Sequence, residues 1–199
     1  KIITGVTASL ALIDAAIHEK ADALIVHHGF FWKGETGHID GIKKIRIAKI
    51  LQKDINMLAY HLPLDYHPEI GNNTQLAKKM DWVIDIEQSQ KCAWGLIGHT
   101  ATPTTATQLA EQLQKKLKHT PLCIGNQNQI IHRIAWCTGG AQGYFEQAIQ
   151  MGVDAFITGE ISEKHVHIAR ETGVQFIAAG HHATEKFGIE ALGEKLSQT

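Results

Sequence analysis

Histidines and carboxylates gather at four places in the sequence, each directly after an apolar run. These places are His27-His28, the segment from His61 to Asp65, the pair Gly159-Glu160, and the segment from His181 to Glu185. In two of the segments a histidine precedes a carboxylate by four residues, and side chains with that spacing on a helical turn can reach one ion. Pro63 argues against a full helix in the first of these segments, although a single turn would serve.

This set of side chains is typical of a catalytic or exchangeable metal site. Imidazole and carboxylate without thiolate suit zinc, iron, manganese or nickel. The groups are numerous enough for a pair of ions that share a bridging carboxylate, and such two-metal sites can activate water near neutral pH. We therefore expect two divalent metal ions per chain, of an identity that the sequence does not specify.

Most of the other histidines are expected to take no part in this site, although the chain has 13 of them. A single histidine is most often a surface residue or a hydrogen-bonded core residue. This interpretation applies to His18, His38, His99, His119 and His132. His165 and His167 are two residues apart on one predicted helix, so they face different directions and are expected to be solvated.

Three further features could contribute to a cleft near these clusters. The helix that carries Lys43, Lys44, Arg46, Lys49 and Lys53 has a basic face, which is expected to be solvated, or alternatively to attract phosphates toward a cleft. Trp32 either lines the mouth of the cleft or packs in the core. The segment CTGGAQG (137–143) precedes a predicted helix and could bind an anion.

A dinucleotide fingerprint, a P-loop and a GxSxG motif are all absent from the sequence.

Composition narrows the class of protein. The chain has 199 residues, of which 44% are hydrophobic, and a formal net charge of -1, which gives no support for nucleic-acid binding. No apolar run is long enough for a membrane span, and no signal-peptide pattern is seen. Cys92, Cys123 and Cys137 form no CxxC pair, so a disulfide framework is not expected and a cytoplasmic location fits best. Strand-like residues begin directly at Lys1, so upstream residues are expected.

The elements that position the site alternate between strand and helix. Strands are expected at about 1–6, 21–26 and 55–61, with helices at about 9–20 and 41–53, and the last third repeats this order. Such alternation predicts an α/β fold with mostly parallel sheets and flanking helices. Because ligands bind at the carboxyl ends of parallel strands, we expect the polar clusters to meet there.

The two ends of the chain resemble each other. KADALIVHHG aligns with GVDAFITGEI, and INMLAYH aligns with VQFIAAGH. We interpret this as a duplicated α/β unit. The first half spans residues 1–84 and the second half residues 130–199, and a connecting subregion rich in Thr, Gln and Gly spans residues 85–129.

Four segments, in this order, resemble a known family: IVHHGFFWKGE, HLPLDYHPEIGNN, VDAFITGEISE and AAGHHATE. They look like the NIF-three-like dinuclear metal-centre family, in particular its bacterial YbgI type, often labelled a GTP cyclohydrolase type 2 homologue. The resemblance covers nearly the whole chain. It implies two related α/β halves, a toroidal homohexamer, and additional residues before the first strand and after the last helix.

The resemblance also implies roles for individual residues. The metal ligands would be His27, His28, Asp65, His181 and Glu185, with Glu185 bridging the two ions. His61 and Glu160 would line the site as supporting or acid/base groups, whereas the spacing alone would make His61 a ligand.

Three functions are consistent with these residues. The preferred one is a metal-dependent hydrolase that acts on a nucleotide-like substrate, with His61 or Glu160 moving protons. The second is a non-catalytic metal chaperone, store or sensor, for which a closed coordination shell is expected rather than an open cavity. The third is a ring-forming scaffold stabilised by metal, for which the ligands should lie near subunit contacts.

Overall fold

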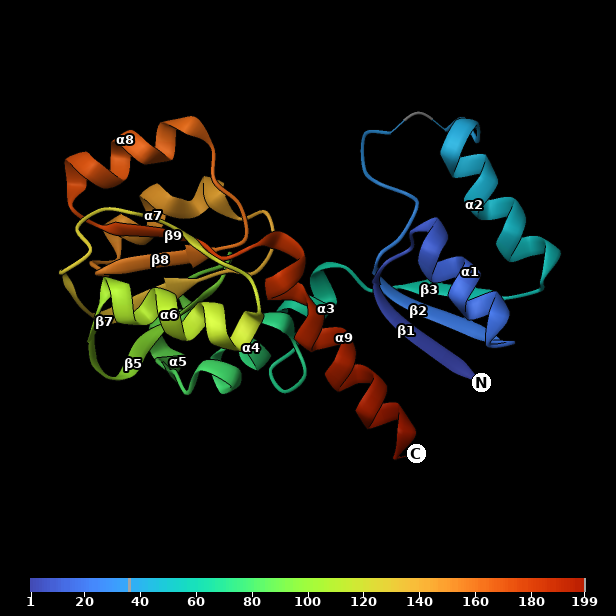
Figure 1. Ribbon diagram of the computed structural model, residues 1–199, viewed down its shortest axis with the longest axis horizontal. Helices are drawn as coiled ribbons and strands as arrows, with labels where there is room; N and C mark the ends of the chain where they lie inside the picture. Colours follow the sequence, from blue (N-terminus) through green and yellow to red (C-terminus); the bar gives the residue numbers. More distant parts are fainter. Residues whose placement is uncertain (36, 199) are drawn as a thin grey trace.

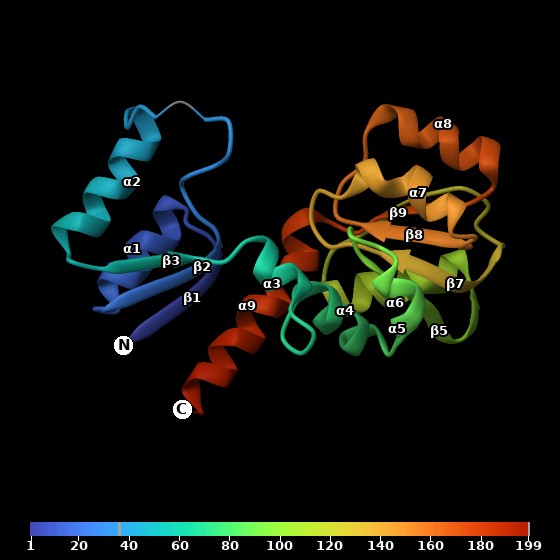
Figure 2. The same ribbon diagram turned by 180° about the vertical axis from the view of Figure 1, so that it is seen from behind.

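The computed structural model describes residues 1–35 and 37–198, which form two α/β units joined at their centre (Figures 1 and 2). The first unit contains a parallel sheet in the order β1 (Ile2–Thr7), β2 (Ala23–His28) and β3 (Asn56–Ala59). Helices α1 (Leu10–His18) and α2 (Gly41–Gln52) pack on this sheet, with Ile13, Leu24 and Ile50 in the shared core. The expected α/β fold with flanking helices is confirmed.

The second unit contains a six-stranded sheet in the order β4-β5-β7-β8-β9-β6. Its three neighbouring strands β7 (Ile130–Trp136), β8 (Ala155–Thr158) and β9 (Gln175–Ala178) are parallel. The other strands, β4 (Val83–Ile84), β5 (Leu96–Thr105) and β6 (Leu122–Ile124), pair antiparallel. The second sheet is therefore mixed, with a parallel centre.

Helices cover both faces of the second sheet. Helix α6 (Ala106–Leu117) packs on one face, against Ile134, Ile157 and Ile177. Helices α7 (Phe145–Gln150) and α8 (Glu163–Thr172) pack on the other face, against Phe156 and Phe176 (Figure 1). This alternation follows from the opposite orientation of successive strand residues. A short helix, α5 (Ile86–Gln90), and a 3₁₀ turn, η1 (Gln142–Tyr144), complete the unit.

The segment 85–129, expected to connect the two halves, contributes β5, α6 and β6 to the second unit. Leu109, Leu113 and Leu117 of α6 lie at helical spacing, and their side chains are almost fully inaccessible to solvent. The Thr105 side chain caps this helix by accepting from the Gln108 backbone N–H, and the Gln108 side chain accepts from the Thr105 N–H. This segment is therefore an integral part of the sheet and its helical cover.

Three helices occupy the region between the two sheets. They are α3 (Leu62–Tyr66), α4 (Asn72–Met80) and α9 (His181–Ser197). Figures 1 and 2 show α9 running from the second unit toward β1, where Ile189 packs with Val6 and Ile25. As Pro63 indicates, α3 is only a short helix, with the proline in its first turn. Within the described residues, no helix combines the length and the hydropathy that crossing a membrane would require.

The parallel parts of the two sheets repeat each other in detail. The middle strand is β2 in the first sheet and β8 in the second, and each follows an aspartate and begins with an alanine. The strands on either side pair with β2 and with β8 in the same register. Backbone hydrogen bonds recur at equivalent positions. They are Asp22 N to Lys1 O and Asp154 N to Arg133 O, both at 2.8 Å, and Tyr60 N to Val26 O at 2.9 Å and Ala179 N to Thr158 O at 2.7 Å. The interpretation of related halves thus extends to individual hydrogen bonds.

Helix α8 corrects one expectation. His165 is 2% exposed, with its ring stacked on Phe176 at a centroid distance of 5.3 Å, so the prediction that it is solvated is wrong. Its Nδ1 accepts a hydrogen bond from the Ser162 N–H. His165 lies four residues before buried Ala169, on the face of α8 that covers the sheet. His167, on a different face, is exposed as expected and contacts Glu163.

Candidate metal centre

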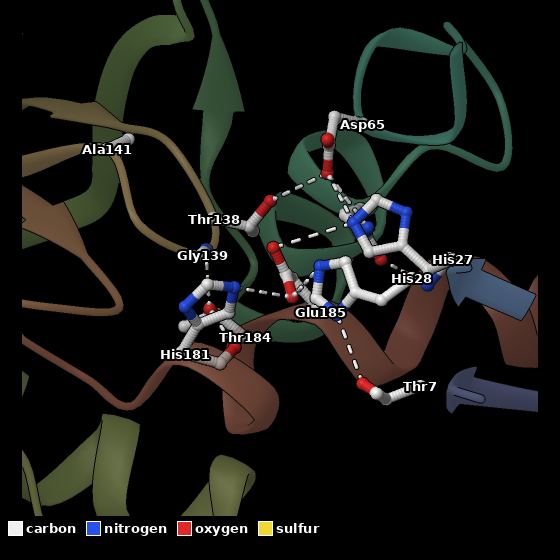
Figure 3. A network of polar contacts seen from close by, with 12 residues as sticks. Thr7, His27, His28, Asp65, Thr138, Gly139, Ala141, His181, Thr184 and Glu185 are labelled. Atoms are coloured by element: carbon white, nitrogen blue, oxygen red, sulfur yellow. Dashed lines mark hydrogen bonds and ion pairs between the residues drawn. The ribbon is translucent and has the colours of Figure 1, made fainter. Parts of the chain in front are cut away.

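The candidate site lies where the carboxyl ends of the strands in the first sheet face the start of α9. Parallel pairing in the first sheet places His27-His28, at the end of β2, beside the residues that follow β3. These residues are His61, directly before α3, and Asp65 within it. The first turns of α9 supply His181 and Glu185, which share one helix face. Figure 3 shows five of these side chains converging.

Glu185 is at the centre of the cluster. Its Oε2 lies 3.0 Å from His181 Nε2 and 3.3 Å from His28 Nε2. Its Oε1 lies 3.5 Å from His27 Nε2, which is in turn 3.5 Å from Asp65 Oδ1. The structure therefore brings all five expected ligands together, and Glu185 contacts histidines from both sides (Figure 3).

The outer nitrogen of each histidine is held by a neighbouring group. His27 Nδ1 lies 3.0 Å from the Tyr60 carbonyl oxygen, and His28 Nδ1 lies 3.0 Å from Thr7 Oγ1. His181 Nδ1 lies 2.7 Å from Glu160 Oε1. Metal-binding histidines in proteins are typically held in this way by the nitrogen that does not bind the ion. All three Nε2 atoms consequently point toward the shared centre.

Asp65 is held by groups from α4 and the second unit. The Asn72 amide nitrogen donates to Asp65 Oδ1 at 2.9 Å, and the Thr138 hydroxyl lies 3.4 Å from the same oxygen. Asn72 Oδ1 in turn accepts from the Gly188 N–H of α9 at 2.9 Å. Asn72 is fully buried, so it fixes Asp65 relative to the helix that carries Glu185.

The chemistry of the donor atoms fits divalent metal ions. His27 is 0% exposed and Glu185 is 3% exposed, yet neither His27 Nε2 nor Glu185 Oε2 makes a hydrogen bond within the described part of the chain. Leaving buried polar atoms without partners is costly unless a bound group satisfies them. The donor atoms of His27, Asp65 and Glu185 lie within 4.8 Å of one another, as do those of His28, His181 and Glu185.

His61 belongs to the same cluster. Its donor atom forms a third close group with those of His27 and His28, and its ring lies 4.9 Å from that of Trp32. The geometry is thus compatible both with a ligand role for His61 and with a role beside the ligands. Glu160 is exposed and contacts His181, and its other carboxylate oxygen accepts from the Gln142 side chain at 3.3 Å.

The pKa values of the side chains in the cluster are shifted in different directions. Burial would raise the pKa of Glu185, but the His181 and His27 imidazoles beside it lower this pKa to about 2. The contact with Glu185 raises the pKa of His181 to about 9. Burial lowers the pKa of His28 to about 4 and also lowers that of His61, whereas burial raises the pKa of Asp65. At neutral pH the metal-free cluster therefore combines an ionised Glu185 with a protonated His181.

An open cavity of about 520 Å³ adjoins the cluster. Trp32 lies on the wall of this cavity, which is one of the two positions expected for it. Arg46, Tyr66 and Tyr144 also line the cavity. The sequence suggests a place near a cleft for Arg46, through the basic face of its helix, but gives no signal for Tyr66 or Tyr144. The glycine-rich segment contributes to the cavity wall, its last two residues begin the turn η1, and the expected helix follows as α7 from Phe145. Burial raises the pKa of Cys137 in this segment to about 12, so its thiol stays protonated.

Gly139 of the same segment leaves space for the Glu185 carboxylate. A Cβ atom at Gly139 would lie 1.9 Å from Glu185 Oε1 and 3.1 Å from His181 Nε2. The residue also has a φ of +70°, which favours glycine. The closeness of this glycine to Glu185 is evident only in the folded chain.

Comparison with known proteins identifies the family of this chain. A family model described as Duf34/NIF3 (NGG1p interacting factor 3) matches residues 1–199. The chain belongs to this family. The NIF-three-like resemblance carried by the four sequence segments is thereby confirmed.

Relatives in the family have similar sequences over the entire chain. A protein named "GTP cyclohydrolase 1 type 2 homolog" from Pseudomonas aeruginosa is 50% identical over 200 residues, covering 100% of this chain and 79% of the relative. One of the same name from Haemophilus influenzae is 53% identical over 204 residues, covering 100% and 80%.

Solved structures of relatives have the same fold. The structure titled "protein ybgI, unknown function" is 47% identical with a TM-score of 0.94, covering 100% of this chain and 80% of that one. A second structure, of the protein TTHA1606 from Thermus thermophilus, is 32% identical with a TM-score of 0.85, covering 99% and 78%.

Proposed function

We propose that this NIF3-family chain binds two divalent metal ions through His27, His28, Asp65, His181 and Glu185. His27 and Asp65 would hold one ion, His28 and His181 the other, and Glu185 both. The main support is the buried Glu185 carboxylate, which contacts histidines of both groups and whose Oε2 has no hydrogen-bond partner among the described residues. The metals suited to these donors are zinc, iron, manganese and nickel.

We further propose that the protein is a metal-dependent hydrolase. Divalent ions at these positions would supply Lewis-acid activation of water and substrate. His61 would accept the proton of the attacking water, since burial lowers its pKa and thereby favours the neutral ring that can act as a base. Glu160 would hold the His181 ring in place through Nδ1. The open cavity beside the cluster supports catalysis over simple metal storage, for which a closed shell of ligands would be sufficient.

The proposed substrate class is a nucleotide. Support comes from the names of the relatives, which refer to a GTP cyclohydrolase, and from the volume of the cavity, about 520 Å³, which falls in the range typical of small-molecule sites. Trp32 is 40% exposed at the cavity and offers an aromatic surface to a planar base.

We also propose self-association into the hexameric toroid that the family resemblance implies. Large apolar side chains are exposed along α2, at Ile42, Ile45 and Leu51, and surfaces of this kind are often contacts between chains. Light scattering on the purified protein tests this proposal: a mass of six chains supports it, and a monomer at micromolar concentration contradicts it.

The hydrolase proposal is tested by incubating protein loaded with zinc, iron, manganese or nickel with GTP and ATP and separating the products by chromatography. Turnover is expected with at least one metal. It should fall about 100-fold or more in a His61→Gln variant, the usual effect of losing a general base. His167→Gln removes an exposed histidine of α8 and serves as the control. Absence of turnover by protein that retains its metal would instead favour a metal chaperone, store or sensor.

A further inference from the structure

The basic face of α2 contains one cation that differs from its neighbours. Lys43 pairs with Glu35 at 2.9 Å, and Lys49 pairs with Asp14. Arg46 lies between them, three residues from each, and lines the cavity beside the candidate metal centre. The expectation that this face is solvated therefore does not describe Arg46, whose position fits the alternative of attracting an anion.

Arg46 makes no ion pair or hydrogen bond with any residue that the structure describes, and its Nε is buried without a partner. The guanidinium group of arginine carries a positive charge and donates hydrogen bonds but accepts none. A buried, unpaired N–H of a charged group has a substantial desolvation cost. A ligand that supplies acceptor oxygens at this wall of the cavity would remove that cost.

The chemistry of the cavity indicates what such a ligand is. Arg46 is the only lysine or arginine among the described residues of the cavity lining. The guanidinium group presents a planar fork of N–H donors that matches the oxygens of phosphate and carboxylate. The two carboxylates of the lining, Asp65 and Glu185, are already committed to the cluster of histidines, and Trp32 offers an aromatic surface in the same cavity.

We propose that Arg46 is a substrate-binding residue that holds an oxyanion group, a phosphate or a carboxylate, of a ligand in the cavity. The inference rests on the proposed function in its assumption that the cavity is the substrate site. With a nucleotide as substrate, the group is its phosphate. Arg46 thereby selects anionic substrates over their neutral counterparts, and this role is separate from metal binding.

Protection from chemical modification tests this proposal directly. Metal-loaded protein is treated with phenylglyoxal, which modifies arginine, in the presence of GMP, guanosine or succinate, and mass spectrometry follows each arginine. We expect saturating GMP to slow modification of Arg46 about fivefold or more, and guanosine to have no effect. Arg170 is exposed on α8 and away from this cavity, so its modification should not change with any of the three.

Substitution provides the second test. Arg46→Gln should raise the dissociation constant for GMP about 10-fold or more, as expected for a charge-assisted hydrogen bond. It should leave guanosine binding and metal content unchanged. The matched control is Lys44→Gln, which removes an exposed charge from the same helix and should change GMP binding less than twofold.

The outcomes separate this inference from the proposed function. If GMP binds but neither GMP nor succinate protects Arg46, or Arg46→Gln and Lys44→Gln behave alike, the role of Arg46 is refuted while nucleotide binding stands. Protection of Arg46 by succinate but not by GMP supports the oxyanion site and refutes the nucleotide. Protection by neither anion overturns the inference.

Discussion

Replacing Gly139 with alanine is expected to impair metal binding without unfolding the protein. The added Cβ would lie 1.9 Å from Glu185 Oε1, so this oxygen must move about 1.5 Å to reach an ordinary contact of 3.4 Å. Glu185 is 3% exposed and belongs to both candidate ligand groups, so a displacement of this size disturbs the two together. Because even small misplacement of ligands weakens metal sites, we expect dissociation constants to rise about 100-fold or more.

Gly152 provides a matched control for backbone strain. Its φ of +68° is nearly that of Gly139 at +70°, but a Cβ at Gly152 would meet nothing within 4 Å. A left-handed conformation costs a non-glycine residue about 1–2 kcal/mol. Both alanine variants should therefore lower the melting temperature by about 2–8 °C, as expected for a chain of this size. Only Gly139→Ala should weaken metal binding as well.

The assay is competition for zinc between each variant and a chromogenic chelator, with thermal unfolding measured in parallel. Gly140→Ala offers a second comparison, because its Cβ would make an ordinary contact of 3.5 Å with Glu160 and His181. Equal zinc affinities for Gly139→Ala and Gly152→Ala would refute the reasoning, since they would show that Glu185 does not hold the ions.

Three other predictions concern stability and protons. Asn72→Ala leaves Asp65 and the Gly188 N–H without their buried partner and should lower the free energy of unfolding by about 2 kcal/mol, measured with urea. Leu113→Ala should lower the free energy of unfolding by about 2–5 kcal/mol, whereas the exposed control Gln114→Ala should lower it by less than about 0.5 kcal/mol. Equal small effects of the two substitutions would mean that α6 is not part of the core. In the metal-free chain the raised pKa of His181 stabilises the fold below about pH 6.5, and this contribution is lost as the pH rises through about 9. Zinc binding at pH 7 should accordingly release about one proton from His181, seen calorimetrically as a binding enthalpy that depends on the buffer.

The sequence is sufficient to predict the position of the candidate site. The strand containing ALIV ends on His27-His28, and parallel pairing necessarily places the residues after β3 beside it. The four-residue spacing of His181 and Glu185 likewise predicts a shared helix face, which the first turns of α9 provide. These predictions depend on local periodicity and on the geometry of parallel sheets, and both can be read from one sequence.

The segment 85–129 is harder to predict because its regularity is interrupted. Strand β5 shifts register between His99 and Thr104, so the alternation of buried and exposed residues is lost within it. Strand β6 has only three residues, and its partner β9 is distant in the sequence. The antiparallel edges of the second sheet depend on such long-range pairing, which the composition of the segment does not indicate.

The groups that surround the candidate metal centre also depend on tertiary structure. Asn72, Gly139 and Arg46 come from three separate parts of the chain and meet Asp65, Glu185 or the cavity only after folding. The burial of His165, in contrast, is indicated by the sequence itself. Its burial could have been anticipated from the apolar Ala169 four residues later, which marks the same face of α8 as the covered one.

The central claim is a two-metal centre bridged by Glu185, and metal content per chain tests it most directly. Plasma mass spectrometry on untagged protein, after incubation with zinc, iron or manganese and removal of excess metal, should find about two ions per chain. The isosteric Glu185→Gln variant should lose most of both, and the exposed control Glu171→Gln should retain both. Wild-type protein without bound metal, or a Glu185→Gln variant that keeps two ions, would contradict the account.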